Sequence, residues 1–279
     1  MKQKLLALAL TLGLSLSLAA CSGGSGGAAT PAPAGATPDS QQAAGSDKAY
    51  VQEKGTLVVG ITDFAPMDYR DGNGDWIGFD ADMAKAFAAE LGVEVEFIEI
   101  TWGNKAMELE TKAIDVVWNG MTLDDEVRSL MGTSDPYCLN GQVVVLPASK
   151  AADYQTVDSL SGLNFAVENE SAGAKQLDAL GLSYVAKVTQ ADALMEVAAG
   201  ASDACVIDLL MAGAMIGEGT SYPDLTYTVQ LNSEEYGVGF RVGSDLVEVF
   251  NTFWKQAYDA GTVMTTATAY GVQESIIEK

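Results

Sequence analysis

The chain has 279 residues, which is enough for one large domain or for two domains of ordinary size. Its 15 basic and 38 acidic residues give a net charge of -23, which repels phosphate backbones and anionic lipid headgroups and argues against nucleic-acid binding. The absence of histidine excludes Ser-His and Cys-His catalysis and removes the commonest transition-metal ligand.

Residues 1–21 have the pattern of an export signal. A basic start, "MKQK", precedes an apolar run, "LLALALTLGLSLSL", that is too short for a stable membrane span. The following "LAAC" resembles the lipobox of bacterial lipoproteins, which implies that Cys21 is acylated with chains such as palmitate and anchors the protein to the lipid bilayer. The alternative is a plain signal peptide cleaved nearby. Residues 22–48, mostly Gly, Ser, Ala, Pro and Gln, predict a flexible tether.

From about Gly55 onward, strands alternate with helices. The first series predicts strands at 56–61, 93–100 and 114–121 and helices at 80–92 and 105–113. The second predicts strands at 142–146, 163–167, 183–189, 203–208, 225–231 and 236–242, and helices at 171–181, 191–200, 209–217, 245–260 and 262–270. This order is typical of α/β folds with largely parallel sheets, and two such series predict two lobes with a ligand cleft between them.

Several short motifs point away from nucleotide or metal chemistry. No GxGxxG, Walker or GxSxG motif is present, so we expect no cofactor. The segment "DGNGDWIGFDAD" begins with the spacing of a calcium loop, but Trp76 stands where such a loop needs glycine. A hairpin turn at 72–74 is the favoured interpretation, and we expect no metal site.

The sequence allows two interpretations for each of three carboxylates and for one pair of thiols. Asp115, Asp203 and Asp208 lie in or at the ends of apolar strands, where they either face a ligand crevice or serve in turns and caps. Cys138 and Cys205 either form a disulfide or remain as free buried thiols.

From about Gly55 to the C-terminus, the chain resembles the polar amino-acid-binding proteins of bacterial ABC importers, solute-binding family 3. Six segments in the same order carry the resemblance: "VGITDFAPMDY", "GDWIGFDADMAKAFAAELG", "KAIDVVWNGMTLDDE", "TSDPY", "DACVID" and "YGVGFRVGSDL". The resemblance implies an α/β fold of the type II periplasmic-binding-protein class, in which two hinge strands join two lobes and the second lobe is inserted into the first. The hinges then fall near 137–141 and 232–236, with lobe 1 at 49–137 and 236–279 and lobe 2 at 141–232.

The resemblance also implies ligand contacts from lobe 1. Phe64 and Trp102 match two aromatic residues that sandwich the ligand's side chain, although Phe64 also suits the lobe core. Asn119, Gly120 and Thr122 match the segment that holds the ligand's α-amino and α-carboxylate groups.

Lobe 2 supplies the remaining contacts that the resemblance implies. Ser171 begins a helix whose backbone amides bind the α-carboxylate, and its hydroxyl equally suits an N-cap. Asp208 matches the acid that pairs with the α-ammonium group. Glu168, and Asp63 beside Phe64, stand where acids suit a cationic side chain such as that of Lys, Arg or ornithine, although chance placement is the alternative in so acidic a chain.

Arg128 departs from the family pattern. The family places a carboxylate-binding arginine five residues after the position of Thr122, and Val127 stands there in this chain. A displacement of one residue turns a side chain by about 100° around a helix. Arg128 is therefore either a carboxylate ligand that reaches back or a surface arginine paired with Asp124 or Asp125.

Taken together, the resemblance implies a monomeric extracytoplasmic lipoprotein that is not an enzyme. It would capture a polar amino acid and deliver it to the permease of an ABC transporter, held at the outer face of the cell membrane by its lipid. Two alternatives remain open: an exported dehydratase acting on prephenate or arogenate with Glu168 and Asp208 as acid and base, and a ligand-sensing receptor subunit.

Overall fold

A computed structural model describes residues 45–278 of the chain. The predicted export signal, Cys21 and residues 22–44 of the predicted tether lie outside the described residues. Helix α1 (Asp47–Lys54) begins inside the range assigned to the tether, and Ser46 caps it by accepting a hydrogen bond from the Ala49 N–H. No helix within residues 45–278 has both the length and the apolar character that a membrane span requires.

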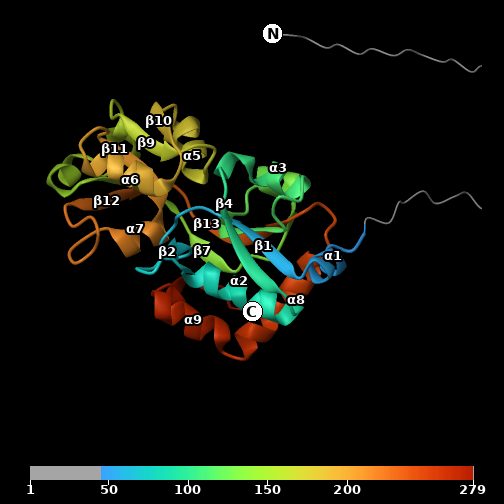
Figure 1. Ribbon diagram of the computed structural model, residues 1–279. Helices are drawn as coiled ribbons and strands as arrows, with labels where there is room; N and C mark the ends of the chain where they lie inside the picture. Colours follow the sequence, from blue (N-terminus) through green and yellow to red (C-terminus); the bar gives the residue numbers. More distant parts are fainter. Residues whose placement is uncertain (1–44, 279) are drawn as a thin grey trace, which may run out of the picture. The chain divides into compact units, whose positions relative to one another are not determined.

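The first sheet has the strand order β4 (Glu94–Glu99), β1 (Thr56–Ile61), β5 (Val116–Thr122), β13 (Glu234–Phe240) and β6 (Gly132–Thr133), with β7 (Cys138–Asn140) also paired to β13. Strand β1 runs parallel to β4 and β5, whereas β13 runs antiparallel to β5, β6 and β7. Figure 1 shows α2 (Phe79–Leu91), α8 (Leu246–Asp259) and α9 (Thr262–Tyr270) together on one side of this sheet, with α3 (Lys105–Glu110) on the other.

The second sheet has the order β10 (Tyr184–Lys187), β9 (Phe165–Glu168), β11 (Ala204–Asp208), β8 (Gln142–Pro147) and β12 (Leu225–Gln230). Strand β9 is parallel to β10 and β11, and β8 is antiparallel to β11 and β12. Helices α5 (Ala172–Leu180), α6 (Gln190–Ala198) and α7 (Leu209–Met215) belong to this part of the chain. Both sheets are therefore mixed, and the expectation of largely parallel sheets fails at β13 and β8, each of which runs opposite to the other strands of its sheet.

The chain passes from the first sheet to the second at Gly141, between β7 and β8, and returns at residues 231–233, between β12 and β13. The second sheet is thus built from an insertion into the first. We refer to the elements of the first sheet as lobe 1 and to those of the second as lobe 2.

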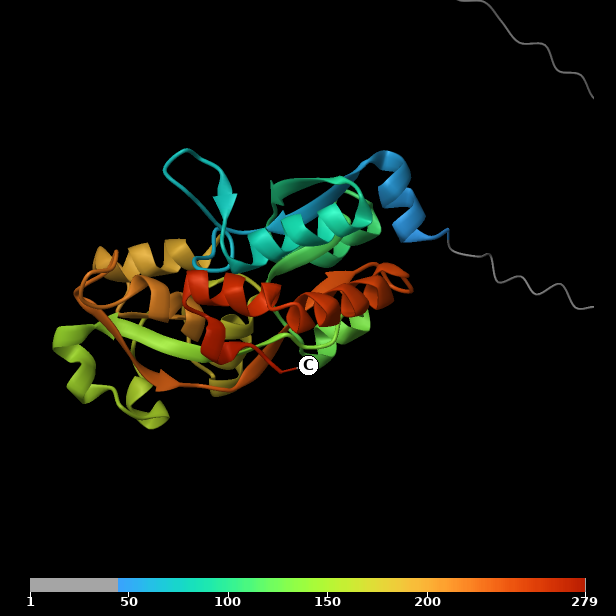
Figure 2. The same cartoon turned by 90° about the horizontal axis from the view of Figure 1, so that it is seen from below.

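Local sequence explains most helix ends. On α2, Met83, Phe87 and Leu91 are buried on one face, and Gly92 ends the helix in the left-handed conformation. In lobe 1, Trp118 of β5 packs edge-on against Phe250 of α8 with ring centroids 4.9 Å apart, which joins the sheet to its helical layer. Figure 2 shows α8 and α9 next to α2 from below.

The segment that began like a calcium loop forms a hairpin between β2 (Tyr69–Arg70) and β3 (Trp76–Ile77). One carboxylate oxygen of Asp71 accepts hydrogen bonds from the backbone N–H groups of Asn73 and Asp75, at 2.8 and 2.9 Å, so this side chain closes the turn. Cys138 and Cys205 are free and buried, which decides between the two interpretations of these thiols.

Candidate functional site

The predicted ligand residues lie mainly where parallel strands end. Asp63 and Phe64 follow β1, Glu168 ends β9, and Asp208 ends β11. Carboxyl ends of parallel strands meet at one edge of a sheet, where α/β proteins bind ligands. The strand order therefore brings Glu168 and Asp208, on neighbouring strands, to the same edge of the lobe 2 sheet.

Asp208 is buried in a hydrogen-bond network that spans both connections between the lobes. It accepts hydrogen bonds from the Tyr236 hydroxyl at 2.6 Å and from the amides of Gln142 at 2.9 Å, Asn140 and Gln190. Glu234 shares two of these donors, at 2.7 Å from Asn140 and 2.8 Å from Gln142. Burial, and then the charge of Glu234, raises the pKa of Asp208 to about 7.

Asn119 and Gly120 have their polar groups occupied within lobe 1. The Asn119 side chain accepts hydrogen bonds from the Thr62 N–H and hydroxyl, at 3.0 and 2.8 Å, and donates to Asp68 at 2.8 Å. The Gly120 N–H donates to Asp80 at 2.7 Å. Gly120 has φ 54°, and a Cβ here would lie 2.4 Å from the Phe64 ring, so only glycine fits. These two residues shape the strand, and neither the Asn119 side chain nor the Gly120 N–H is free for a ligand.

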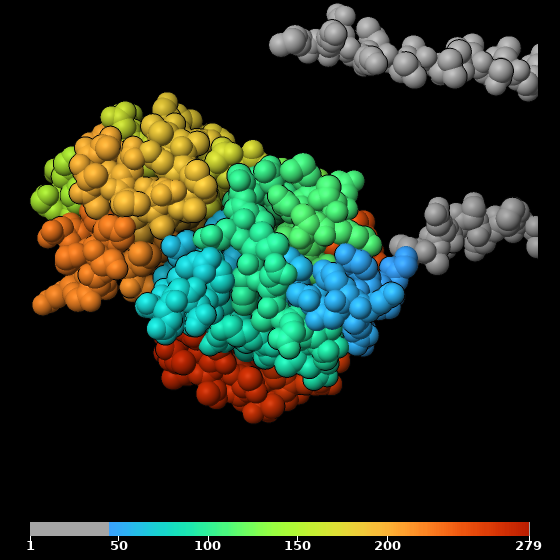
Figure 3. Space-filling view, viewed as in Figure 1, coloured from blue at the N-terminus to red at the C-terminus, as the bar shows by residue number. Residues whose placement is uncertain are grey.

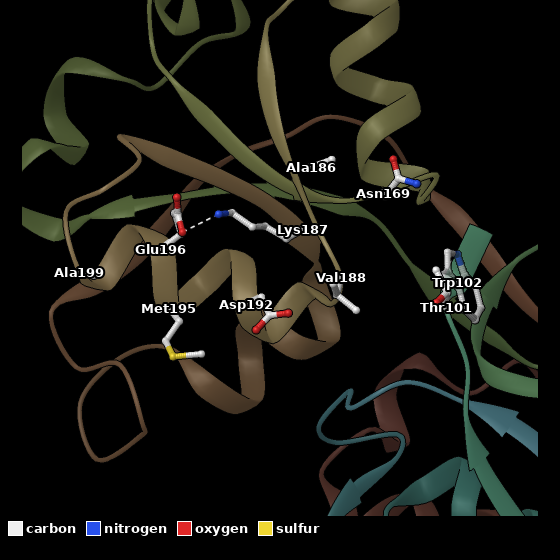
Figure 4. Close-up of a pocket in the computed structure, with 10 residues that line it drawn as sticks. All are labelled: Thr101, Trp102, Asn169, Ala186, Lys187, Val188, Asp192, Met195, Glu196 and Ala199. Atoms are coloured by element: carbon white, nitrogen blue, oxygen red, sulfur yellow. Dashed lines mark ion pairs between the residues drawn. The ribbon is translucent and has the colours of Figure 1, made fainter. Parts of the chain in front are cut away.

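The two predicted sandwich aromatics lie in different surroundings. Phe64 is only 2% exposed and packs edge-on against Tyr236 with ring centroids 6.4 Å apart. These surroundings resemble the lobe core, which was the alternative position expected for Phe64. Trp102, in the short helix η1 (Trp102–Asn104), lines a cavity of about 690 Å³, here called the Trp102 cavity. The opposite side of that cavity comes from lobe 2, including Asp192, Met195 and the ion pair between Lys187 and Glu196 (Figure 4).

Ser171 and Thr122 approach a second cavity from different lobes. The Ser171 hydroxyl caps α5 by accepting a hydrogen bond from the Ala174 N–H at 3.1 Å, which is the N-cap role weighed for it. The next residue, Ala172, and Thr122 of β5 line the same cavity of about 510 Å³. The first turn of α5 and the end of β5 therefore face a common space.

Arg128 does not join the other predicted residues. It lies on α4 (Asp125–Leu130), its side chain is exposed, and its guanidinium donates to the Thr133 hydroxyl at 3.4 Å. Val127, at the position where the family has its arginine, is buried in lobe 1. The rotation of one residue around α4 thus carries the charge to the surface.

Two lysines that the sequence interpretation missed lie where the lobes meet. Lys175 of α5 pairs with Asp124 and Glu126 of lobe 1, each at 2.6 Å. Lys105 of α3 places its ammonium 4.6 Å from the centroid of the Trp102 ring. Both line a third cavity, of about 360 Å³, here called the Lys105 cavity. Their spacing in the sequence could have identified both lysines. Lys105 follows Trp102 by three residues and Lys175 follows the N-cap of α5 by four, so each lies one helical turn from a predicted ligand contact.

Asp192, which lines the Trp102 cavity, interacts electrostatically with one acid from each lobe. Burial, and then the charge of Glu99, raises the pKa of Asp63, and Asp192 adds to the rise. Burial, and then the charge of Asp208, raises the pKa of Glu168 to about 8, and Asp192 again adds to the rise while Lys105 opposes it. Asp192 therefore lies within electrostatic reach of both Asp63 and Glu168.

Glu168 is the least satisfied of these acids. It is 3% exposed, and its Oε1 atom has no hydrogen-bond partner among residues 45–278. A buried carboxyl in this condition gains most from a cation or donor brought by a ligand.

The other two strand-end acids have structural roles. Asp115 pairs with Lys54 at 2.5 Å and with Arg241 at 3.3 Å, and accepts the Val58 N–H at 2.9 Å. Asp203 accepts hydrogen bonds from Asn164. Of the three acids considered, only Asp208 lies in the network at the connections between the lobes.

A family model described as bacterial extracellular solute-binding proteins, family 3, matches residues 57–273. The arginine-binding extracellular protein ArtP of Bacillus subtilis is 28% identical over 217 residues, covering 75% of this chain and 83% of that protein. The L-cystine-binding protein TcyJ of Escherichia coli is 26% identical over 218 residues, covering 76% and 81%. Cyclohexadienyl dehydratase of Pseudomonas aeruginosa is 30% identical over 122 residues, only 43% of this chain and 46% of that protein.

Among solved structures, the P235GK mutant of the T. maritima protein ArgBP is 31% identical with a TM-score of 0.76, covering 81% of this chain and 99% of that one. This similarity, together with the two sheets and the inserted second lobe, confirms the expected type II periplasmic-binding-protein fold.

Proposed function

This chain belongs to the bacterial extracellular solute-binding proteins, family 3, and on that premise we propose that it captures a basic amino acid between its two lobes and delivers it to the permease of an ABC transporter. The choice of a basic ligand rests on one observation: both lobes contribute to a group of four carboxylates, Asp63, Glu168, Asp192 and Asp208. A basic amino acid offers two cationic groups to such a site, and fixed carboxylates hold them through charge-assisted hydrogen bonds. The arginine-binding relative ArtP supports this choice.

In this proposal Asp208 receives the α-ammonium group, and Glu168 with Asp63 and Asp192 faces the cationic side chain. Trp102 supplies a flat apolar wall and a cation–π contact. Thr122 and the first turn of α5, after Ser171, contribute polar contacts from either lobe. The lobe 1 residues behind the site help to hold it in place through their packing and hydrogen bonds: Phe64, Asn119 and Gly120. Arg128 does not belong to the proposed site.

The lobes, at 49–137 with 236–279 and at 141–232, would close about hinges near 137–141 and 232–236. Ligand contacts to both lobes favour the closed arrangement, because a ligand shifts a conformational equilibrium only by its difference in affinity for the two states. We propose that the protein acts as a monomer.

The extracytoplasmic location follows from the family. We further propose that acylated Cys21 anchors the protein to the cell membrane, and that the segment 22–44 tethers the lobes within reach of the permease. Metabolic labelling with a fatty-acid analogue tests the anchor: the wild-type chain should carry the label, and Cys21→Ala should lose both the label and the membrane fraction.

A second candidate function is a dehydratase. It is favoured by the partial similarity to cyclohexadienyl dehydratase and by Glu168, whose raised pKa keeps the carboxyl protonated near neutral pH, as a general acid requires. We rank it second, because the similarity covers less than half of either chain.

One experiment separates the two functions. The purified protein is incubated with the twenty amino acids, ornithine and prephenate, and thermal stabilisation and product formation are followed. We expect saturable stabilisation by arginine, lysine or ornithine, without turnover of prephenate. If the wild type converts prephenate and Glu168→Gln does not, the protein is an enzyme and the proposed binding function is wrong.

A further inference from the structure

The cations around the lobe junction differ in their partners. Three lysines line the Trp102 and Lys105 cavities: Lys105, Lys175 and Lys187. Lys187 pairs with Glu196 at 2.6 Å, and Lys175 pairs with two carboxylates at the same distance. Lys105 forms no ion pair with any residue in 45–278. Its ammonium donates only to the Trp102 carbonyl oxygen, at 3.3 Å.

The position of Lys105 is fixed from two sides. Its ammonium lies over the ring of Trp102, and the carbonyl contact holds it there. Across the Lys105 cavity lies the turn between β9 and α5, including Asn169 and Glu170. The lobes approach closely here, because a Cβ on Gly103 would lie 2.6 Å from a carboxylate oxygen of Glu170. In Figure 3 the green surface around α3 adjoins the yellow surface of lobe 2.

Lys105 is also close to the proposed ligand. Trp102 lines the Trp102 cavity, and Asn169 lines both that cavity and the Lys105 cavity (Figure 4). The ammonium of Lys105 therefore lies beside the compartment where Asp192 and Glu168 would hold the cationic side chain.

The ammonium of Lys105 has carboxylates at a distance but no ion-pair partner in contact among residues 45–278. Burial, and then the charge of Lys175, lowers the pKa of Lys105, and the charges of Glu168, Asp124 and Glu126 only partly oppose this shift. A carboxylate brought by a ligand would supply the ion-pair partner that Lys105 lacks. The guanidinium of Arg128, directed toward Thr133 on the surface, does not meet this need.

We propose that Lys105 binds the α-carboxylate of the captured amino acid, so that this chain takes its carboxylate-binding cation from α3 and not from α4. The inference rests on the proposed function. Each charged group of the ligand then has an oppositely charged partner: Lys105 for the carboxylate, Asp208 for the α-ammonium, and Glu168 with Asp63 and Asp192 for the cationic side chain.

The test removes the carboxylate charge from the ligand and the ammonium from the protein in turn. Affinities for L-arginine and L-argininamide are measured by calorimetry at pH 6.5, where the α-amino group of the amide remains largely protonated. The proteins are wild type, Lys105→Met, Lys105→Arg and, as a control outside the site, Arg128→Ala. If another amino acid binds better in the panel, that amino acid and its amide replace the arginine pair.

We expect the wild type and Arg128→Ala to prefer the acid over the amide by about tenfold or more, which is the loss expected when a charged hydrogen-bonding partner is removed. Lys105→Met should reduce this preference to about twofold, and Lys105→Arg should restore most of it. The fold should survive, because the Lys105 ammonium makes a single hydrogen bond to protein; Lys105→Gln serves as a second variant if the Met variant melts early.

Three results would overturn the assignment while leaving the proposed function intact. The first is that the wild type binds both ligands equally, and the second is that Lys105→Met retains the full preference for the acid. The third is that Lys105→Met weakens the binding of both ligands by the same factor, as expected if Lys105 only supports Glu168 structurally. Failure of the wild type to bind any amino acid would overturn both proposals together.

Discussion

Lys175 of α5 and Asp124, the N-cap of α4, form an ion pair of 2.6 Å that joins lobe 2 to lobe 1. Asp124 also accepts the Val127 N–H at 2.8 Å, so one carboxylate both caps a lobe 1 helix and contacts the other lobe. Glu126 adds a second contact to the same ammonium. These contacts stabilise the arrangement of the lobes in this structure, and we propose that the ligand binds to this arrangement.

Replacing Lys175 by Met should therefore weaken ligand binding by about two- to fivefold, in keeping with the small energies of partly exposed ion pairs. The loss should be larger at 0.05 M than at 0.5 M NaCl, because salt screens the wild-type pair. Lys255→Met is a matched control, since Lys255 pairs with Asp259 at 2.9 Å within one helix. Equal losses at both salt concentrations would contradict an electrostatic latch.

Binding of a cation beside Glu168 should release a proton. The pKa of Glu168 is about 8 in the free protein, so the carboxyl is mostly protonated at pH 7 and a cationic ligand must ionise it. Affinity should therefore rise with pH, by about fivefold between pH 7 and pH 8 if Glu168 alone titrates. Calorimetry in buffers of different ionisation enthalpy counts the protons, and Glu168→Gln should reduce the release to the share that comes from Asp208. A wild-type affinity that does not change with pH would exclude Glu168 from the cation site.

Tyr236 should stabilise the hinge most when Asp208 is ionised. Its hydroxyl donates to Asp208, whose pKa is about 7, so the hydrogen bond has a charged acceptor above pH 7 and a neutral one below it. Tyr236→Phe should lower the free energy of unfolding by about 1–2 kcal/mol at pH 8 and by less at pH 5.5. Urea unfolding at the two pH values measures this difference. Tyr184→Phe, which loses only an exposed 3.5 Å contact to Asp178, should change little at either pH.

Arg241 is expected to serve stability and not binding. Its side chain is 10% exposed, and its guanidinium pairs with Asp47 at 3.0 Å and Asp115 at 3.3 Å and donates to the Ile114 carbonyl at 2.9 Å. Arg241→Met leaves buried carboxylates without this partner and should cost about 3 kcal/mol of unfolding free energy. Ligand affinity should stay within about twofold. Arg70→Met is the arginine comparison, because it removes an exposed 3.7 Å pair with Glu99 and the contacts of Arg70 with Gly74 and Trp76 in a surface hairpin, but no buried ion pair.

Arg128→Ala should leave the affinity for the best ligand within about twofold, a difference of about 0.4 kcal/mol. The reason is its exposed position and its contact with Thr133. Titration calorimetry decides the point, and a tenfold loss would return Arg128 to the binding site.

The sequence by itself determined most of the longer helices and strands in the described part of the chain, and it identified the fold, but the pattern of strands and helices did not predict α1 or the short strands β2, β3, β6 and β7. Periodic burial and helix caps depend on residues that are close together in the sequence. Met83, Phe87 and Leu91 predict the buried face of α2, and Gly92 predicts its end. The ordered motifs between Gly55 and the C-terminus fixed the family for the same reason, because each is a short local pattern.

Only the tertiary structure decided what the polar side chains do. Asn119 and Asp208 look alike in sequence, as polar residues in apolar strands, but one is bonded within lobe 1 and the other lies in a network across both connections. Lys105 and Arg128 carry the same charge, and only the packing of Trp102 and the rotation of α4 place one at the lobe junction and the other on the surface. Hydrogen-bond partners and helix rotation depend on residues far away in the chain, and a local pattern does not contain them.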